Sequence, residues 1–388
     1  MKSNFFMEDK MYLYNANINT LTGEIIGNGY VAVENGKITS VGVGNPPKIS
    51  DGDYDCGGNF LFPGFIDSHT HMGLFESGIG AEGDDCNEDS DPVTPNLRTI
   101  DAVNIDDESF ALARKMGITT VVTGSGSANP IGSDFIAIKT NGRYADEAVI
   151  RTVGIKFALG ENPKSTFSDK DSAPVTRMAT AAIIREALTK AKRYISDKEK
   201  AVANDEDLPE YDAKNEALEP LLKREIKAFF HCHKKNDIMT AVRISEEFDL
   251  DYVLVHCTEG HMVADILAEK GASACVGPVI SDKGKPELNG LTTENAGILQ
   301  KTGVCVSICT DHPEVPIQYL SLSSAIAGKN GFSETLEGIT VNAAKMCGIY
   351  DRVGSIEVGK DADLVLFKDS PLGVEETPVM VMIDGKII

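Results

Sequence analysis

The sequence is poor in basic residues: 37 Lys and Arg stand against 59 Asp and Glu in 388 residues, a formal net charge of −22. Nucleic acids and anionic membranes are bound through a basic face, so this balance argues against both kinds of partner. No segment approaches the ~20 consecutive apolar residues of a membrane span. Residues 1–14 contain two acidic residues, Glu8 and Asp9, where a signal peptide carries its apolar stretch, so we expect a cytoplasmic protein.

The eight cysteines show no regular spacing, and no CxxC pair occurs. Most lie inside apolar, strand-like runs, which is typical of small buried side chains in a reducing compartment. This pattern favours structural cysteines over disulfides or a thiolate metal site. A cysteine nucleophile is the alternative at Cys232 and Cys257, because each of these residues neighbours a histidine.

Nucleotide-binding and calcium-binding motifs are also missing. No GxGxxG follows the first strand-like run, and the glycine-rich "TGSGSANPIG" (123–132) lacks the Gly-Lys-Ser/Thr ending of a P-loop. The acidic segment 81–91 lacks the spacing of an EF-hand, so we interpret it as a surface loop. The function must therefore be sought elsewhere in the chain.

The middle of the chain alternates short apolar runs with helix-like stretches such as "DIMTAVRISEEFD". Eight strands alternating with helices indicate a parallel (β/α)8 barrel, with a doubly wound open sheet as the alternative. A longer charged stretch, 176–228, is interpreted as a crossover pair of helices. The predicted strands are 64–69, 119–124, 135–140, 154–160, 228–233, 252–257, 273–280 and 304–311.

The two ends of the chain resemble each other more than they resemble the middle. Residues 11–62 and the last forty residues read as short strands, with hairpin turns at Asn35-Gly36 and Asp384-Gly385. They predict one small β-sandwich domain built from both termini. The expected organisation is a β-sandwich half at 1–62, the barrel at 63–348 and the second half at 349–388.

Only seven histidines occur, and they fall in four short stretches of sequence. In a strand, residues i and i+2 face the same side, so His69 and His71 can converge on one ion. The active sites of (β/α)8 barrels lie at the C-terminal ends of the strands, where each stretch falls. Imidazoles with a carboxylate suit a divalent ion such as zinc. The further candidates at strand ends are His231, His256 and Asp311, while His233 and His261 are either part of the site or hydrogen-bonded scaffolding.

These stretches resemble those of the amidohydrolase superfamily of metal-dependent hydrolases, over nearly the whole chain. "FPGFIDSHTH" is similar to the strand-one signature of that family, and "VHC" and "CTDHP" to its strand-six and strand-eight motifs. "VGSIEVGKDADLVLF" is similar to the return of the chain into the C-terminal β-sandwich. Within the superfamily, the chain is most similar to the imidazolonepropionase-like and prolidase-like branch.

The resemblance implies hydrolysis of an amide, cyclic amide or dipeptide-like C–N bond in a small molecule by metal-bound hydroxide. It implies one or two ions, zinc first and Mn, Fe or Co as alternatives, in a monomer or a homo-oligomer. Asp311 would be a ligand that also shuttles protons, and His256 or His233 would steady the oxyanion if not a ligand. The implied metal ligands are His69, His71, His231, His256 and Asp311.

Members with two metals bridge their ions with a carboxylated lysine or a glutamate near strands three and four. The candidates here are Lys139, Lys156 and Glu161. Lys156 precedes Glu161 by five positions, which places it on the opposite face and ~16 Å down an extended strand. We therefore predict Glu161 as the bridging ligand, with Lys139 as the second choice and Lys156 as a poor one.

Two rival functions share the scaffold. Deaminases of nucleobase-like rings carry a glutamate three residues after the strand-five histidine, where this chain has Lys234, so deamination is the alternative. Some superfamily members are non-catalytic assembly proteins that have lost their ligands, whereas all the matching ligands remain here. Basic side chains near the barrel mouth are candidates for binding a substrate carboxylate: Lys164, Lys234 and Lys235.

Overall fold

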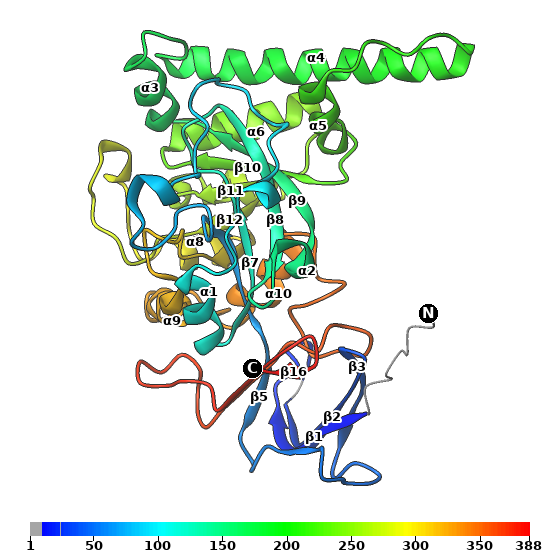
Figure 1. The fold of residues 1–388 in the computed structure, drawn as a ribbon. Coiled ribbons are helices and arrows are strands. Elements are labelled where there is room, and N and C mark those ends of the chain that lie inside the picture. Colours follow the sequence, from blue (N-terminus) through cyan, green and yellow to red (C-terminus); the bar gives the residue numbers. More distant parts are fainter. Residues whose placement is uncertain (1–9, 24) are drawn as a thin grey trace.

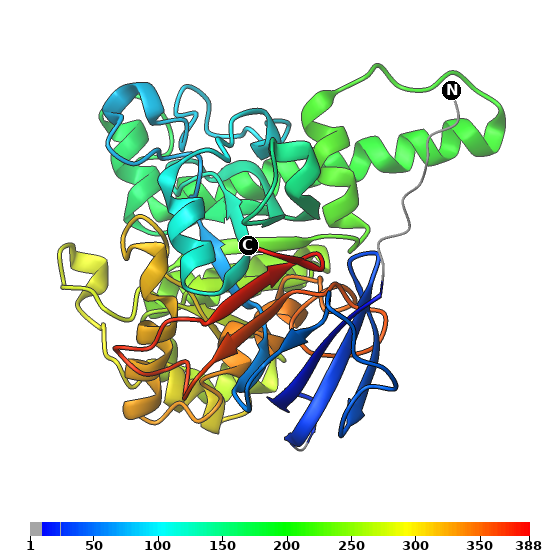
Figure 2. The ribbon, with the colours of Figure 1, turned by 60° about the horizontal axis from the view of Figure 1, so that its bottom comes forward.

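The computed structural model describes residues 10–23 and 25–388 and contains two eight-stranded sheets. One sheet forms a barrel from the middle of the chain, and the other combines strands from both ends (Figures 1 and 2). The predicted (β/α)8 barrel with a small terminal β domain is therefore confirmed.

The barrel strands follow one another in chain order around the sheet. Their side chains are buried almost throughout, which explains why each reads as a continuous apolar run rather than an alternating one. Each predicted run became a strand. The strands are β6 (Phe65–Thr70), β7 (Ile118–Gly124), β8 (Ile131–Lys139), β9 (Val149–Ala158), β10 (Lys227–Cys232), β11 (Tyr252–His256), β12 (Ser273–Val276) and β13 (Cys305–Ile308).

Strand β8 runs opposite to its neighbours, so the prediction of an all-parallel barrel is wrong at this strand. It pairs antiparallel with both β7 and β9, whereas the other pairs of barrel strands are parallel. A parallel crossover needs a dozen or more residues, and the connection 125–130 between β7 and β8 is too short for one. The C-terminal end of β8 therefore lies at the opposite end of the barrel from those of its neighbours.

This reversal decides the position of Lys139, the last residue of β8. Its buried ammonium lies 2.6 Å from Asp363 Oδ2, 3.0 Å from Asp361 Oδ2 and 3.2 Å from Asp384 Oδ1. All three carboxylates belong to the C-terminal part of the chain that joins the terminal sheet. Lys139 thus joins the barrel to the terminal domain, and it is wrong as a second choice of bridging ligand.

The first and last barrel strands are tied together by polar contacts at their ends. The Asp67 carboxylate accepts hydrogen bonds from the backbone N–H (3.0 Å) and the hydroxyl (2.6 Å) of Thr310. The Asp311 N–H donates to the His69 carbonyl (3.2 Å), and the His71 N–H donates to the His312 carbonyl (2.8 Å). These contacts hold the candidate ligands of strands one and eight side by side.

Most helices pack around the barrel. The long helix α4 packs beside α3 and α6 and extends beyond the barrel, with α5 beside it (Figure 1). The predicted helical stretch 176–228 thus contains a helix pair. No helix in the described part of the chain has the length and apolarity to cross a membrane. The helices are α1 (Glu108–Lys115), α2 (Ala145–Ala148), α3 (Glu161–Ser168), α4 (Arg177–Asn204), α5 (Ala213–Leu222), α6 (Lys235–Phe248), α7 (Ala264–Glu269), α8 (Asn295–Lys301), α9 (Leu320–Lys329) and α10 (Val341–Met346).

The terminal sheet has the order β16-β15-β14-β5-β1-β2-β3, with β4 paired to β1. Antiparallel pairing of β14 with β5 joins the two ends of the chain. Asn35-Gly36 and Asp384-Gly385 all have positive φ, as type I′ turns require. The strands are β1 (Met11–Ile18), β2 (Ile26–Glu34), β3 (Lys37–Val43), β4 (Tyr54–Asp55), β5 (Phe60–Pro63), β14 (Leu364–Phe367), β15 (Met380–Ile383) and β16 (Lys386–Ile387).

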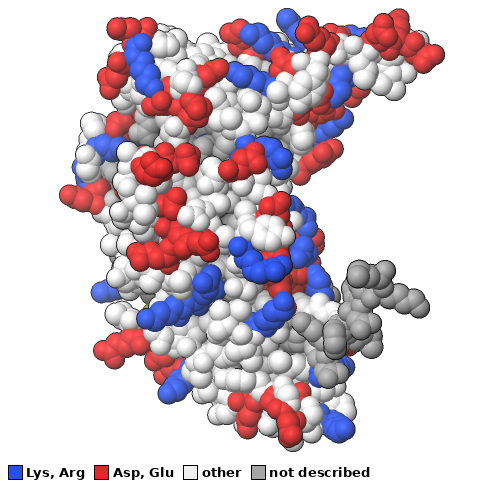
Figure 3. All heavy atoms as spheres, viewed as in Figure 1, with Lys and Arg blue, Asp and Glu red and all other residues white. Residues whose placement is uncertain are grey.

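Acidic and basic side chains are interspersed on the face drawn in Figure 3. The described residues of this face therefore form no extended basic surface, although many lysines and arginines lie on it.

Candidate metal centre

A cavity of about 600 Å³ opens at the end of the barrel where most strands have their C-termini. The predicted histidines reach it from β10, β11 and the segment that follows β6, and Asp311 follows β13. The sequence therefore predicted the location of this cluster correctly. The cavity-lining candidates are His71, His231, His233, His256 and Asp311, while His69 lies buried beside them.

Asp311 lies between the two histidines of the first strand motif. Its Oδ1 atom is 3.3 Å from His69 Nε2 and 3.4 Å from His71 Nε2. His71 Nδ1 lies 2.7 Å from the carbonyl oxygen of Gly124 and donates a hydrogen bond to it. This contact leaves the Nε2 lone pair free, an arrangement that orients histidine ligands in metal sites.

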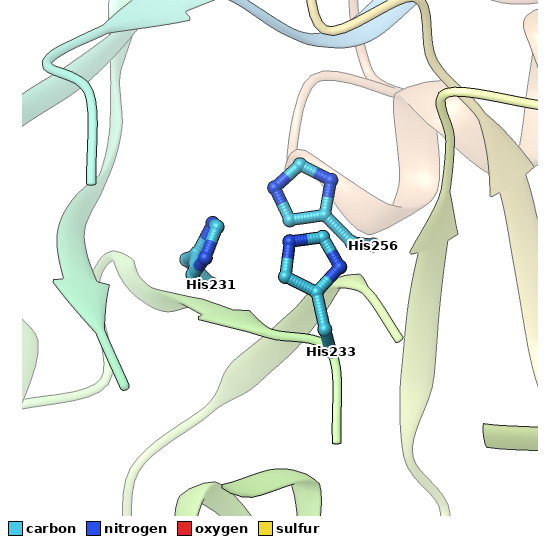
Figure 4. A group of neighbouring side chains, drawn as sticks. All are labelled: His231, His233 and His256. Carbon is cyan, nitrogen blue, oxygen red and sulfur yellow. The ribbon is translucent and has the colours of Figure 1, made fainter. Parts of the chain in front are cut away.

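Three more histidines, His231, His233 and His256, form a second group, in which one ring nitrogen from each residue lies within 4.8 Å of those of the other two (Figure 4). The rings of His233 and His256 are stacked, with planes 14° apart. Each ring has a hydrogen-bond partner at Nδ1. The carbonyl partner of His256 requires a proton on Nδ1 and leaves its Nε2 available for an ion, whereas the hydroxyl partners of His231 and His233 allow either tautomer. The partners are Ser127 Oγ for His231 (2.8 Å), Thr258 Oγ1 for His233 (2.7 Å) and Gly277 O for His256 (2.7 Å).

The chemistry of this donor set fits a divalent metal ion. His231 Nε2 and Asp311 Oδ1 are buried and have no hydrogen-bond partner among the described residues. Bonds of ~2.0–2.2 Å to a tetrahedral ion place neighbouring ligand atoms ~3.3–3.5 Å apart. The separations of 3.3 and 3.4 Å around Asp311 Oδ1 have this value.

Burial also gives these groups the charge states that a metal requires. It holds the pKa of His69 and His231 well below the usual range, so their rings are neutral. Burial alone would raise the pKa of Asp311, but His256, His69 and His71 hold it well below its usual value. The cluster therefore offers neutral imidazoles at His69 and His231 and an ionised carboxylate. Burial lowers the pKa of His71, but Cys86 and Asp311 outweigh it and raise that pKa to about 10, so this ring must release a proton when a metal binds.

Two of the candidate ligands adopt a backbone conformation that is uncommon outside glycine. His256 has φ +67° and Asp311 has φ +55°, both in the left-handed region. Such residues cost about 1–3 kcal/mol each and persist where the surrounding structure over-determines them. The two turns direct polar side chains to the barrel mouth, which points to a functional constraint.

Lys156, on β9, lies inside the cluster. Its side chain is fully buried, and Nζ is 3.4 Å from His69 Nε2. Burial lowers the pKa of its ammonium to about 8. The geometric argument against Lys156 is therefore wrong. Strand β9 ends only two residues later, at Ala158, and the long lysine side chain covers the remaining distance to the histidines.

Glu161, the predicted bridging ligand, begins helix α3 instead. Its backbone N–H, rather than its carboxylate, reaches the cluster and donates to Glu287 Oε2 (3.0 Å). Among the described residues, its carboxylate belongs to neither group of candidate ligands and does not line the cavity. The geometry therefore does not support the bridging role of Glu161.

Glu287 is a buried carboxylate that sequence reasoning missed. Its Oε1 atom lies 3.6 Å from His231 Nε2, 3.5 Å from His233 Nε2 and 2.8 Å from Lys285 Nζ. It belongs to the 3-10 turn Pro286–Leu288, inside the polar segment that follows β12. Such a segment reads as exposed loop, and the only available signal was that it follows a barrel strand.

The predicted carboxylate-binding lysines lie elsewhere. Lys234 Nζ pairs with Glu259 (2.9 Å), and both line a separate surface pocket with Lys235 and Arg177. Lys164 does not line the histidine cavity either. These three lysines are therefore not placed to bind a substrate in that cavity.

The remaining histidines and cysteines lie outside the two ligand groups. His312 Nδ1 accepts from the backbone N–H of Ile317 (3.1 Å), a structural contact, and His261 has no part in either group. Burial raises the pKa of Cys257 to about 12 and that of Cys232 well above its usual value. Both thiols stay protonated, which argues against a cysteine nucleophile.

Comparison with known proteins gives a consistent result. The model of the amidohydrolase family matches residues 60–388. Amidohydrolase tasK of Hapsidospora irregularis is 30% identical over 387 residues, which span 92% of this chain but only 39% of that protein. The imidazolonepropionase of Brucella anthropi is 25% identical over 408 residues, or 93% of this chain and 94% of that protein.

A solved structure covers almost the entire chain. The crystal structure of an amidohydrolase from Thermotoga maritima MSB8 has a TM-score of 0.93 at 39% sequence identity. The match covers 97% of this chain and 99% of that one. The arrangement of barrel and terminal sheet is therefore shared with a solved structure.

Proposed function

The chain belongs to the amidohydrolase family, as its sequence motifs predicted, and we propose that it is a metal-dependent hydrolase of a C–N bond. The substrate would be an amide, cyclic amide or dipeptide-like small molecule. The observation that carries the proposal is the position of Asp311 Oδ1, 3.3 and 3.4 Å from the Nε2 atoms of His69 and His71. His71 and Asp311 line a cavity large enough for such a substrate, and His69 lies buried beside them.

The ligands proposed for the metal are His69, His71, His231, His256 and Asp311. A divalent ion in such a site lowers the pKa of water towards ~7 and polarises a carbonyl group. Zinc suits the nitrogen and oxygen donors best, and Mn, Fe and Co are the alternatives.

Asp311 is the proposed proton carrier. It is ionised at neutral pH and within reach of both histidines of the first motif, so it can accept a proton from water at the cavity floor. It would then deliver that proton to the leaving nitrogen. His233 lines the same cavity, and its Nε2 atom would steady the developing oxyanion.

Deamination is the second candidate, and the position of Glu287 favours it. The position of the deaminase glutamate itself argues against it, because Lys234 stands there and lines the separate pocket with Glu259. Glu287, however, brings a buried carboxylate to 3.5 Å from His233 Nε2 from another loop. This carboxylate would take a proton from water and then deliver it to a ring nitrogen. A non-catalytic assembly role is the weakest candidate, because the ligand set is intact.

The first expected result concerns the purified wild-type protein. It should contain close to stoichiometric divalent metal by elemental analysis and should release amine or ammonia from a panel of amides, dipeptides and aminated rings. A chelator should abolish turnover, and added zinc should restore it. A protein that purifies without metal and acts on none of these compounds after reconstitution would contradict the proposal.

We also propose that Lys156, rather than Glu161, supplies the bridging group as a carbamate. Its pKa of about 8 leaves part of the amine neutral at neutral pH, and only the neutral amine adds carbon dioxide. Its Nζ atom at 3.4 Å from His69 Nε2 places the adduct among the candidate ligands.

The second expected result tests this assignment. Lys156→Met should lower the metal content and turnover at least about tenfold, because it removes a charged ligand from a buried site. Glu161→Gln is the matched control and should keep both. Reconstitution of the wild type should also depend on bicarbonate. The opposite outcome, with metal lost in Glu161→Gln and retained in Lys156→Met, would restore Glu161 as the bridging ligand.

A further inference from the structure

We infer that Lys285 is a substrate-recognition residue whose ammonium binds an anionic group, most simply a carboxylate, of the substrate. The inference rests on the proposed function, since it concerns the same cavity, and it specifies the class of substrate. Among the described residues that line the cavity, Lys285 is the one lysine or arginine. Its side chain is 32% exposed.

The Lys285 ammonium is held in place by two oxygen atoms. Nζ lies 2.8 Å from Glu287 Oε1 and 3.1 Å from Asn162 Oδ1. The contact with Glu287 is an ion pair and that with Asn162 a hydrogen bond. An ammonium group has three N–H donors, so these two contacts leave at least one donor for a ligand. A lysine fixed in this way loses little conformational entropy when it binds a carboxylate.

Glu287 itself sits in a site built for it. Its carboxylate is 1% exposed and accepts the backbone N–H of Glu161 at the start of α3. Gly160 has φ +88°, and a Cβ atom there would lie 2.6 Å from Glu287 Oε2. Only glycine therefore leaves room for this carboxylate. Glu287 is a positioning residue for Lys285.

Lys285 is also near the reacting groups. Glu287 Oε1 is 2.8 Å from Lys285 Nζ and 3.5 Å from His233 Nε2, so the ammonium and the histidine group share one neighbour. A small amide whose carbonyl reaches the histidines can thus place a carboxylate on Lys285. Substrates that carry a carboxylate close to the scissile bond fit this spacing.

Acidic residues at the edge of the cavity are the main argument for a cationic substrate instead. Asp84, Asp282 and Glu314 line the cavity and are exposed at its edge. Interactions with exposed charges are screened by water and salt, whereas a half-buried ammonium is screened much less. Lys285 therefore favours an anionic group of the substrate near the histidines.

The test compares compounds that differ only in that group. Dipeptides and their C-terminal amides, and N-acetyl amino acids and their amides, are assayed with the metal-loaded wild type. The free acids should have the higher kcat/KM. Lys285→Gln should reduce kcat/KM for the acids by about tenfold to a hundredfold, the range for a hydrogen bond to a charged group, and should reduce it much less for the amides.

Lys283→Gln is the matched control, because Lys283 lies in the same loop, donates to the Asn289 carbonyl and does not line the cavity. It should keep the preference for acids. Glu287→Gln should mainly raise KM for the acids, since it releases Lys285 without removing it. A preference for the amides in the wild type, or an equal loss for acids and amides in Lys285→Gln, would overturn the inference.

Binding measurements separate this inference from the proposed function. Free amino acids and their amides are titrated calorimetrically against metal-loaded wild type and Lys285→Gln. If no compound of the panel is hydrolysed but the acids bind tighter in a Lys285-dependent manner, the proposed chemistry fails and the inference stands. If compounds are hydrolysed but neither their hydrolysis nor the binding of the free acids depends on the carboxylate, the proposed function stands and the inference about Lys285 fails.

Discussion

Replacing His69 and His71 together with alanine is expected to remove bound metal and activity at the same time. Each residue contributes an Nε2 atom within 3.4 Å of Asp311 Oδ1, and an ion cannot be held there by the carboxylate alone. Without an ion, water keeps a pKa near ~15.7 instead of ~7, so turnover should fall at least about a thousandfold.

The measurement is metal content by elemental analysis alongside turnover, with circular dichroism to confirm folding. His261→Ala is a suitable control, because His261 belongs to neither ligand group. It should keep both metal and activity. Stoichiometric metal in the doubly substituted protein would show that the two histidines are not ligands.

Asp311→Asn is expected to leave the fold intact and to reduce kcat by about 10²–10⁴-fold, the usual contribution of general acid–base catalysis. An amide oxygen can still approach an ion, but it cannot carry a proton at neutral pH. Asparagine also tolerates the left-handed conformation better than most residues, so φ +55° at this position should add little strain.

Metal content distinguishes loss of the base from loss of the ion. The mutant should retain most of its metal while losing turnover, whereas the alanine pair loses both. Asp265→Asn, on an exposed position of α7, controls for the removal of a carboxylate. Near wild-type kcat in Asp311→Asn would mean that another residue is the base, and Glu287 is the carboxylate to test next.

The sequence by itself determined the barrel, the terminal domain and the candidate site at the strand ends. Short buried strands produce continuous apolar runs, and the chain leaves each strand on the same side of a parallel barrel. Polar residues directly after such runs therefore meet. This reasoning located His69, His71, His231 and His256 together without any knowledge of tertiary contacts.

The reversal of β8 was decided only by the tertiary structure. Periodicity is the same in either direction, so an apolar run does not reveal which way its strand points. The short connection after β7 imposes the antiparallel pairing and carries Lys139 to the terminal domain, where three carboxylates surround it. Strand β9, by contrast, runs parallel to β10 and ends on the side of the histidine cluster, where Lys156 lies beside His69.

Tertiary structure alone also identified Glu287 and Lys285. Both lie in a polar loop that sequence patterns assign to the surface, and their roles come from neighbours more than 100 positions away, such as Asn162 and Glu161. A loop follows no period, so its side chains are placed by the groups they meet across the fold. The sequence could thus predict where the site lies, while long-range contacts decided which side chains complete it.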